Sequence, residues 1–591
     1  MKEFLKYTSA TIVGILIVTV AMGVISVISL VGMVASEQAA TKVKDNSVFV
    51  LSLSGNIAER TKDDVIGQIL GNADLTIGLQ DIMTSIQKAK NDDNIKGIYI
   101  ESGMLAINSP ATAQALRNQL VDFKKSGKWI VAYADTYTQL SYYICSVADK
   151  VYLNPQGMID WHGVMAQGIY LKDLLAKFGV KMQLSKVGKY KSAPEMFTGE
   201  KMSEPNKEQL SAYINGIWNV MLTDVAKSRK LTKDNLNRYA DNFITVADPK
   251  DYIKMKLADK LLYTDEVKYE IKKMLKIDKD DDINQLSLND MKNLPKEDKD
   301  KGGKIAVYYA YGDVVDSSTG SVSGDNCIAA KDVCKDLEDL MNNDNIKAVV
   351  LRVNSGGGSA YASEQIWHSV VKLKEKKPVV VSMGDYAASG AYYLSCAANY
   401  IYAEPTTLTG SIGIFGMFPD LSGLLTDKLG IKFDEIKTNK FSAFGTQARP
   451  FNDEEMMYLN SYIDRGYKLF RKRVADGRHL SVDAVENIAQ GRIWIGSDAI
   501  KIKLVDGMGG IYDAIDKAGK LAKLSEYQTV SYPVQKSWTE QLLADITNKE
   551  DYLDEHIKQS LGEYYAPFMF VKNINKQNAI QARMPYQLII K

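Results

Sequence analysis

The amino-acid sequence predicts an α/β protein made of two tandem copies of one domain, preceded by a single N-terminal transmembrane helix. Three observations lead to this fold class. The chain opens on an uncharged apolar run, and strand-like and helix-like segments of crossover length alternate after it. Two long stretches also match in order, about 250 positions apart, which indicates a duplicated domain. Alternation of strands and helices favours mostly parallel sheets in each copy.

The N-terminal segment predicts a membrane anchor. Two lysines precede residues 7–36, an uncharged run dominated by Ile, Val, Leu, Ala and Gly. About 20 apolar residues span a bilayer, whereas a cleavable signal peptide has an apolar core of only about 7–15 residues. We therefore expect residues 1–46 to form a cytoplasmic N-terminus and a retained signal anchor. The body should lie on the far side of the membrane, although lysines on both flanks leave the charge asymmetry small.

The composition is that of an ordinary globular protein. The chain has 591 residues, of which 46% are hydrophobic and 25% charged, with a net charge of +1. Because there is no basic excess to neutralise phosphates, we expect no nucleic-acid partner. The four cysteines form no CxxC pair or His/Cys ligand spacing, so we expect no metal and no cofactor. Whether Cys327 and Cys334 pair in an exported protein is left open.

The repeat fixes the expected domain boundaries. Asn-Asp-Asp-Asn-Ile-Lys at 91–96 returns as Asn-Asn-Asp-Asn-Ile-Lys at 342–347, and each copy continues into a strand-like run. Between the copies lies a segment rich in Lys, Asp and Asn, with few and scattered apolar residues, which is typical of a solvated linker. The predicted parts are a first repeat at 47–278, a linker at 279–303, a second repeat at 304–525, and a C-terminal extension at 526–591 for packing or oligomer contacts.

One serine stands at the junction of a predicted strand and helix. The strand-like residues 378–382 lead to Ala-Ala-Ser-Gly at 387–390, and an apolar helical pattern follows. On such a turn, Ser389 would sit where developing negative charge is favoured, as a nucleophile requires. A serine N-cap in a packed turn is the commoner role of this pattern. The turn alone therefore leaves both interpretations open.

The two halves differ at the positions where catalytic residues are expected. With the Tyr-Tyr pairs of the halves aligned, Ser389 falls opposite Gln139, so the first half lacks the serine. The glycine run at 356–358 follows a buried strand of the second half and has no counterpart in the first. Glycines at a strand end free backbone N–H groups to stabilise an oxyanion. A phosphate-binding loop is the rival interpretation, but the Lys-Ser/Thr of a P-loop is missing.

The candidate base comes from the first half. None of the four histidines closely follows the serine turn, and lysine is the other base that can partner a serine. Lys191 lies in Lys-Tyr-Lys-Ser-Ala at 189–193, whose counterpart Lys-Phe-Ser-Ala at 440–443 lacks that lysine. One half thus keeps a lysine and the other a serine. This complementarity predicts one composite site per chain.

To act as a base, Lys191 must lose its proton. A free lysine with a pKa of about 10.4 is neutral in roughly one of 2,500 molecules at pH 7. Burial near apolar surface can lower that pKa by roughly 3 units, and a neighbouring hydroxyl would aim the lone pair. Ser411, in the strand-like stretch 409–416, is the candidate for that hydroxyl.

The combination of motifs resembles the signal peptide peptidase A family in its long, duplicated, membrane-anchored form, also called protease IV. The motifs are Asn-Ser-Gly-Gly-Gly-Ser at 354–359, Ala-Ala-Ser-Gly at 387–390, Leu-Thr-Gly-Ser-Ile-Gly-Ile-Phe-Gly at 408–416 and Tyr-Lys-Ser-Ala at 190–193. The resemblance implies tandem Clp/crotonase-like domains of ββα spiral units and a Ser/Lys dyad.

The same resemblance implies a role for each matching residue. Ser389 would be the nucleophile, Lys191 the general base, and Ser411 the hydroxyl that orients the lysine. The backbone N–H of Gly357, with that of Gly358, would form the oxyanion hole. One departure is Gly356, where the family usually has proline, and this puts the rigidity of the oxyanion loop in doubt.

The resemblance also implies a substrate, an assembly and a location. Substrates would be remnant signal peptides and other apolar peptides, cut through an acyl-enzyme. The assembly would be a homo-tetramer or another dome-shaped ring. The location would be the bacterial inner membrane, with residues 7–36 in the lipid bilayer and the catalytic body on the periplasmic side.

Two alternatives use the same fold. A crotonase-like acyl-CoA enzyme also relies on a backbone oxyanion hole, but it does not need the serine. A membrane scaffold that has lost its activity would keep the fold without keeping both dyad positions.

Overall fold

The computed structural model of the chain describes residues 4, 6–8, 11–19, 22, 42–61, 76–107, 109–295, 302–318, 327–534, 579–584 and 589–590. Most of the predicted anchor at 7–36 lies outside these residues, although residues 11–19 are helical. No helix within the described ranges combines the length and the apolar character that crossing a membrane requires.

The first repeat is built on a parallel sheet, in which six strands run in the order β2-β1-β3-β4-β5-β8 and β9 pairs with β1. Its strands are β1 (Ser47–Ala58), β2 (Thr76–Gly78), β3 (Ile95–Ala106), β4 (Trp129–Tyr137), β5 (Lys150–Ile159), β8 (Lys260–Leu261) and β9 (Gln285–Leu286). The helices of this repeat are α3 (Leu79–Asn91), α4 (Pro110–Lys124), α5 (Gln139–Cys145), α6 (Lys172–Lys177), α7 (Glu195–Thr198), α8 (Glu204–Arg229), α9 (Lys233–Asp241), the 3-10 helix η1 (Ile244–Val246), α10 (Pro249–Lys254), α11 (Thr264–Leu275) and α12 (Leu288–Lys292).

The second repeat uses the same plan, with strands in the order β19-β17-β15-β13-β10-β21 and with β16 and β20 beside them. Its strands are β10 (Gly303–Tyr311), β13 (Ile346–Ser355), β15 (Val379–Ala388), β16 (Tyr400–Ala403), β17 (Leu408–Gly410), β19 (Ile493–Ile495), β20 (Gly507–Met508) and β21 (Tyr527–Tyr532). Its helices are α13 (Ala330–Asn342), α14 (Ala360–Lys376), α15 (Gly390–Ser395), the π-helix η2 (Gly423–Lys428), α16 (Asp453–Arg478), α17 (Val482–Ile488), α18 (Gly496–Ala499) and α19 (Ile511–Leu521).

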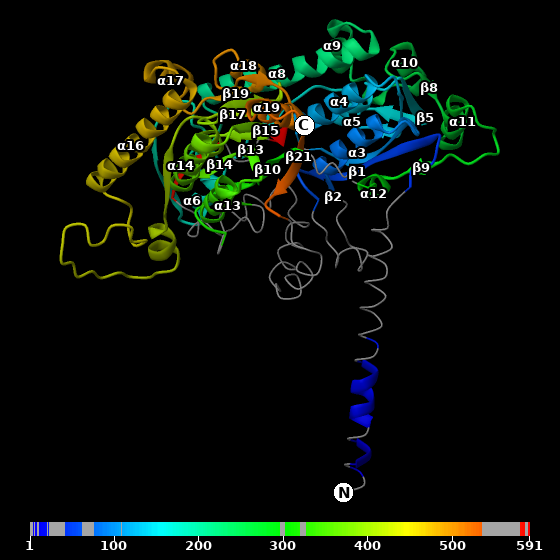
Figure 1. Cartoon of the computed structure of the whole chain (residues 1–591). Coiled ribbons are helices and arrows are strands. Elements are labelled where there is room, and N and C mark those ends of the chain that lie inside the picture. Colours follow the sequence, from blue (N-terminus) through cyan, green and yellow to red (C-terminus); the bar gives the residue numbers. More distant parts are fainter. Residues whose placement is uncertain are drawn as a thin grey trace.

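Of two further sheets, the larger joins the two repeats and the smaller joins the C-terminal extension to the first repeat. One runs β12-β11-β14-β22-β18-β7 and the other pairs β23 with β6. The strands are β6 (Ala166–Gln167), β7 (Lys181–Lys186), β11 (Asp313–Val315), β12 (Cys327–Ala329), β14 (Gly357–Ser359), β18 (Phe415–Asp420), β22 (Ile580–Arg583) and β23 (Ile589–Ile590). Strand β7 of the first repeat therefore pairs with β18 of the second. The repeats lie side by side in Figure 1, with α8 beside β19 at their junction.

The predicted α/β duplication is confirmed. The parallel order β1-β3-β4-β5 of the first repeat returns as β10-β13-β15-β16 in the second. The helix that follows β4, α5, corresponds to α15, which follows β15. The Tyr-Tyr pair of each of these helices is buried in the core of its own repeat.

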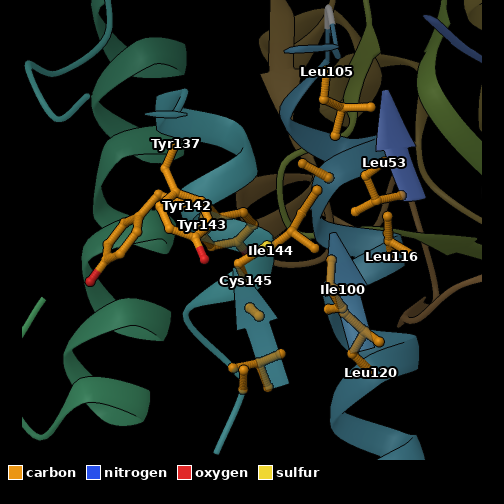
Figure 2. Packing of buried hydrophobic residues seen from close by; sticks show 14 of the residues in the cluster. Leu53, Ile100, Leu105, Leu116, Leu120, Tyr137, Tyr142, Tyr143, Ile144 and Cys145 are labelled. Atoms are coloured by element: carbon orange, nitrogen blue, oxygen red, sulfur yellow. The ribbon is translucent and has the colours of Figure 1, made fainter. Parts of the chain in front are cut away.

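Burial of these short helices fixes the turns before them. Figure 2 shows Tyr142, Tyr143, Ile144 and Cys145 of α5 packed among leucine and isoleucine side chains of the first core. In the second core, α15 presents Tyr392, Tyr393 and Leu394 in the same way. Because close-packed side chains resist displacement, the turn at Ser389 is held by the helix that follows it.

The linker and extension differ from their predictions. The segment predicted as a solvated linker contains β9, which pairs with β1, and α12, and it buries Leu286 and Met291. Its scattered apolar residues are anchors for the first core, so this part of the prediction is wrong. The extension also supplies β21 to the second sheet. Residues 535–578 of the predicted extension lie outside the described residues.

Candidate active site

Ser389 occupies a strained turn between β15 and α15. Its φ is 58° and its ψ is −114°, which is outside the regions that non-glycine residues usually adopt. Its N–H donates to the Gly410 carbonyl of β17 at 2.8 Å, and its carbonyl accepts from the Tyr393 N–H of α15 at 2.8 Å. Strain that the surroundings hold in place is typical of functional residues. A sharp strand-to-helix turn also directs a nucleophile out of its sheet.

Lys191 of the first repeat reaches this turn within the same chain. Its Nζ donates to Ser389 Oγ at 2.6 Å, to Ser411 Oγ at 3.0 Å and to the Ser411 carbonyl at 3.0 Å. All three residues are completely buried. The structure thus brings together the three side chains that were predicted from the sequence, although 198 positions separate the lysine from Ser389.

The environment of Lys191 favours its neutral form. Burial lowers the pKa of this amine well below the usual 10.5. Its three hydrogen-bond partners are two hydroxyls and a carbonyl, so no carboxylate among them offsets the cost of burying a positive charge. A buried neutral amine in contact with a serine hydroxyl can accept its proton.

The loop that carries Lys191 is held by both repeats. The Tyr190 N–H donates to the Gln490 carbonyl at 3.0 Å. Gly491 has a φ of +80°, and a Cβ there would lie 2.6 Å from the Lys191 backbone, so only glycine fits. Gln209 of α8 donates to the Tyr190 carbonyl at 3.1 Å and accepts from the Ile493 N–H of β19 at 3.0 Å. Helix α8 therefore fixes the lysine loop against the second repeat.

The glycine loop lies directly beside the serine turn. Gly357 has a φ of +96°, and a Cβ there would lie 2.7 Å from the Gly390 nitrogen. The Gly357 N–H donates to Ser355 Oγ at 3.1 Å, so it can serve an oxyanion only after exchanging this bond. Gly358 lies within β14, opposite Ala582 of β22 and Val314 of β11. The backbone nitrogen of Gly390 thus lies beside Gly357; sequence analysis did not consider it, although its position after the serine could have indicated it.

Strand β22 lies beside this loop and was not predicted. It runs antiparallel to both β14 and β18, with Gly358 opposite Ala582 and Phe415 opposite Gln581. The Met584 N–H extends the pairing by donating to the Gly356 carbonyl at 2.9 Å. Ala582 is completely buried, and its carbonyl oxygen would be 2.3 Å from a Cβ on Gly357. A segment from the end of the chain is therefore seated between the glycine loop and β18.

Other residues weighed in the sequence lie outside the site. Gln139, the counterpart of Ser389, accepts from the His162 N–H at 3.0 Å and the Gly163 N–H at 2.9 Å, which is a structural role. Neither Cys327 nor Cys334 forms a disulfide in the part of the chain that the structure describes. Among the residues that the structure describes, no cluster of three His, Cys, Asp or Glu side chains is arranged to hold a metal ion.

Family models match both repeats. The model described as peptidase family S49 matches residues 122–278 and 371–525. A Clp protease model matches residues 320–407, which include the glycine loop and the serine turn.

Curated relatives match most of the chain. It is 35% identical to Protease 4 of Salmonella typhi, over 79% of this chain and 76% of the relative. Protease 4 of Haemophilus influenzae is 32% identical over 84% of this chain and 83% of the relative. The chloroplastic serine protease SPPA of Arabidopsis thaliana is 30% identical over 82% and 70%. Among solved structures, ClpP1 from Listeria monocytogenes is 17% identical over 35% of this chain and 92% of that chain, with a TM-score of 0.23.

Proposed function

This chain belongs to peptidase family S49 and is a serine protease with a Clp protease-like α/β fold, and from that premise we propose how it cuts peptides. Ser389 is the nucleophile, Lys191 is the general base, and Ser411 orients the lysine. The observation that carries this proposal is the buried 2.6 Å contact between Lys191 Nζ and Ser389 Oγ. A serine needs an adjacent base to attack a carbonyl, and this lysine is the group in contact.

The contacts support a two-step acyl transfer. As Ser389 Oγ bonds to the scissile carbonyl carbon, its proton moves to neutral Lys191, and the carbonyl oxygen becomes negative. Backbone N–H groups of the glycine loop, Gly357 and Gly358 as the sequence suggested, stabilise that oxygen together with Gly390. The C–N bond then breaks, and the Lys191 ammonium gives its proton to the leaving amine. In the second step Lys191 takes a proton from the water that attacks the acyl carbon, the bond from that carbon to Ser389 Oγ breaks, and Lys191 returns the proton to Ser389 Oγ.

The substrate in this proposal is an extended apolar peptide, such as a remnant signal peptide. Strand β22 supports the extended binding mode, since it lies antiparallel to β14 and β18 beside the dyad. Main-chain pairing of this kind gives affinity, and pockets for alternate side chains give specificity. The test is hydrolysis of a synthetic signal peptide by the full chain in detergent, between pH 6 and 10. The proposal would be overturned if the chain did not hydrolyse the peptide and Ser389 was not labelled by a fluorophosphonate.

Removing the tail is expected to increase activity. A peptide that binds between β14 and β18 must displace β22, so a chain ending at residue 578 should show a severalfold higher kcat/KM, mainly through a lower KM. The measurement is steady-state hydrolysis of one apolar fluorogenic peptide by both chains. The hexapeptide corresponding to residues 579–584 should inhibit the truncated chain competitively. A folded truncated chain with unchanged kinetics, and no inhibition by the hexapeptide, would show that peptides bind elsewhere.

We also place the protein in the bacterial inner membrane. The support is the apolar run at 7–36, which follows two lysines. In this proposal the catalytic body is periplasmic and meets signal peptides that remain in the bilayer after their release. Fractionation of cells, followed by protease treatment of spheroplasts, tests the location and the side of the body. Recovery of the intact full-length chain in the soluble fraction would contradict it.

We also propose that the chain assembles into a homo-oligomer. A long arm at residues 429–447 reaches away from the body at the left of Figure 1. Six large apolar side chains on it are exposed to solvent: Leu429, Ile431, Phe433, Ile436, Phe441 and Phe444. Six exposed apolar side chains on one short arm support an interaction site there, and a second copy of the chain is the partner that the family resemblance suggests.

Substitution on the arm is expected to dissociate the oligomer. Ile436→Asp places a charge where the proposed contact needs an apolar side chain, so the sedimenting mass in detergent should fall towards that of one chain. Ile436→Val keeps the surface apolar and should sediment like the unsubstituted protein. If the unsubstituted chain itself sediments as a monomer, the oligomer is excluded.

A further inference from the structure

A β-bulge lies immediately before the nucleophile turn. Strands β13 and β15 pair in regular register up to Val353 and Met383, and the next pair is Ser355 with Ala387. Three residues of β15, at 384–386, therefore lie opposite the single residue Asn354 of β13. Bulges bend a strand and re-aim the side chains beyond them, and they are common beside active sites. This one sets the direction in which β15 reaches Ser389.

Asn354 forms hydrogen bonds with the backbone and with one side chain of the bulge. Its Oδ1 accepts from the Tyr386 N–H at 3.1 Å, and its Nδ2 donates to Asp385 Oδ2 at 3.0 Å. Asn354 is also the residue before Ser355, whose hydroxyl accepts from the Gly357 N–H. One side chain thus links the start of the glycine loop to the strand that ends at the nucleophile.

The first repeat holds this bulge at two points. At the start of α4, the Thr112 N–H and Oγ1 donate to Asp385 Oδ1 at 2.9 and 2.6 Å. Just beyond β1, Glu59 accepts from Arg352 Nε and Nη2 at 3.0 Å each. Glu59 also accepts from Asn354 Nδ2 at 2.8 Å.

The contacts of this network are buried or partly buried, and Asn354 and Asp385 are half-buried. The exposed fractions are 8% for Glu59, 7% for Thr112 and 4% for Arg352. In such surroundings hydrogen bonds are strengthened and unpaired groups are costly. The buried part of the network, Glu59 with Arg352, therefore resists rearrangement and supports the bulge beside it.

We infer that the inter-repeat clamp, formed by Glu59, Thr112, Asn354 and Asp385, positions the nucleophile turn against the glycine loop. The first repeat then serves catalysis twice, by supplying Lys191 and by fixing the direction of Ser389. The four clamp residues are positioning residues, since none of them contacts Lys191, Ser389 or Ser411 through a hydrogen bond that the structure records. This inference rests on the proposed Ser/Lys peptidase function.

The test compares two substitutions at Thr112. Thr112→Val keeps the shape of the side chain but removes the 2.6 Å hydrogen bond to Asp385, whereas Thr112→Ser keeps the hydroxyl. Displacement of a reacting group by about 1 Å can cost roughly a hundredfold in rate. We expect Thr112→Val to lower kcat roughly ten- to a hundredfold. Thr112→Ser should keep the kcat of the unsubstituted chain. KM should change by less than about twofold, because the clamp positions the reacting atoms and does not bind the substrate.

A matched control comes from the same helix. Asn118 of α4 makes another inter-repeat contact, from its Nδ2 to Glu404 Oε2 at 3.0 Å, which includes none of the four clamp residues. Asn118→Ala should leave kcat unchanged. The pH midpoint of activity should also be unchanged in Thr112→Val, because Lys191 keeps its surroundings, and this separates the clamp from the base.

The outcomes distinguish this inference from the proposed function. If the unsubstituted chain neither hydrolyses peptides nor reacts with a fluorophosphonate at Ser389, the proposed function fails. If it does both, and Thr112→Val melts at a lower temperature but keeps the full kcat, the clamp contributes stability alone and the inference is overturned.

Discussion

Replacing Ser389 by alanine is expected to lower kcat for peptide hydrolysis by roughly 10⁴-fold or more, because it removes the atom that bonds to the substrate. The chain should remain folded, since the hydroxyl makes a single recorded contact, with Lys191. The measurement is kcat on an apolar fluorogenic peptide, together with loss of fluorophosphonate labelling. Any residual activity above the uncatalysed rate would come from substrate binding and the oxyanion hole.

Ser395→Ala is the control for that experiment. Ser395 is also completely buried, but its hydroxyl donates to the Ala391 carbonyl within α15, away from Lys191. Its loss should leave kcat nearly unchanged. Equal activity of Ser389→Ala and the unsubstituted chain would exclude Ser389 as the nucleophile and would reopen the search for the active residue.

Replacing Lys191 by methionine is expected to abolish hydrolysis and to raise the melting temperature. Methionine fills similar space without an amine whose burial disfavours its charged form. Active-site groups of this kind commonly reduce stability for the sake of activity. Lys189→Met is the matched control, because Lys189 lies two positions away, exposed beside the Tyr190 ring. That variant should keep both its activity and its melting temperature.

The pH dependence follows from the lowered pKa of Lys191. The neutral amine is the active form, so activity should rise with pH through a midpoint well below 10.5. Between that lowered pKa and 10.5, the unfolded chain holds a proton that the native chain does not. The free energy of unfolding should therefore increase with pH across this window, and the stability advantage of Lys191→Met should shrink. An activity midpoint near 10.5 would contradict a buried base.

The chemistry of this protein was largely readable in its sequence because duplication supplied an internal reference. Comparing the halves showed a serine present in one and a lysine present in the other. The alternation of strand-like and helix-like segments predicted the parallel sheets, since each kind of segment leaves its own pattern in the local sequence. The signals for Ser389, Lys191 and Ser411 are thus local ones, each a few residues long.

Features that depend on distant contacts were decided by the tertiary structure. The linker was predicted as solvated because its apolar residues show no period, yet Leu286 and Met291 are buried by packing against the first repeat. The position of β22 depends on main-chain hydrogen bonds to β14 and β18, and main-chain groups leave no pattern of side chains to read.

The clamp shows the same division most clearly. Asn354 belongs to a motif that the sequence singled out, but its partners Glu59 and Asp385 lie 295 and 31 positions away. A short polar residue beside a strand is common in any sequence, and only the fold places these three together. The sequence by itself determined which residues could react. The tertiary structure decided how they are buried, aimed and covered, because those properties arise from contacts between the two repeats.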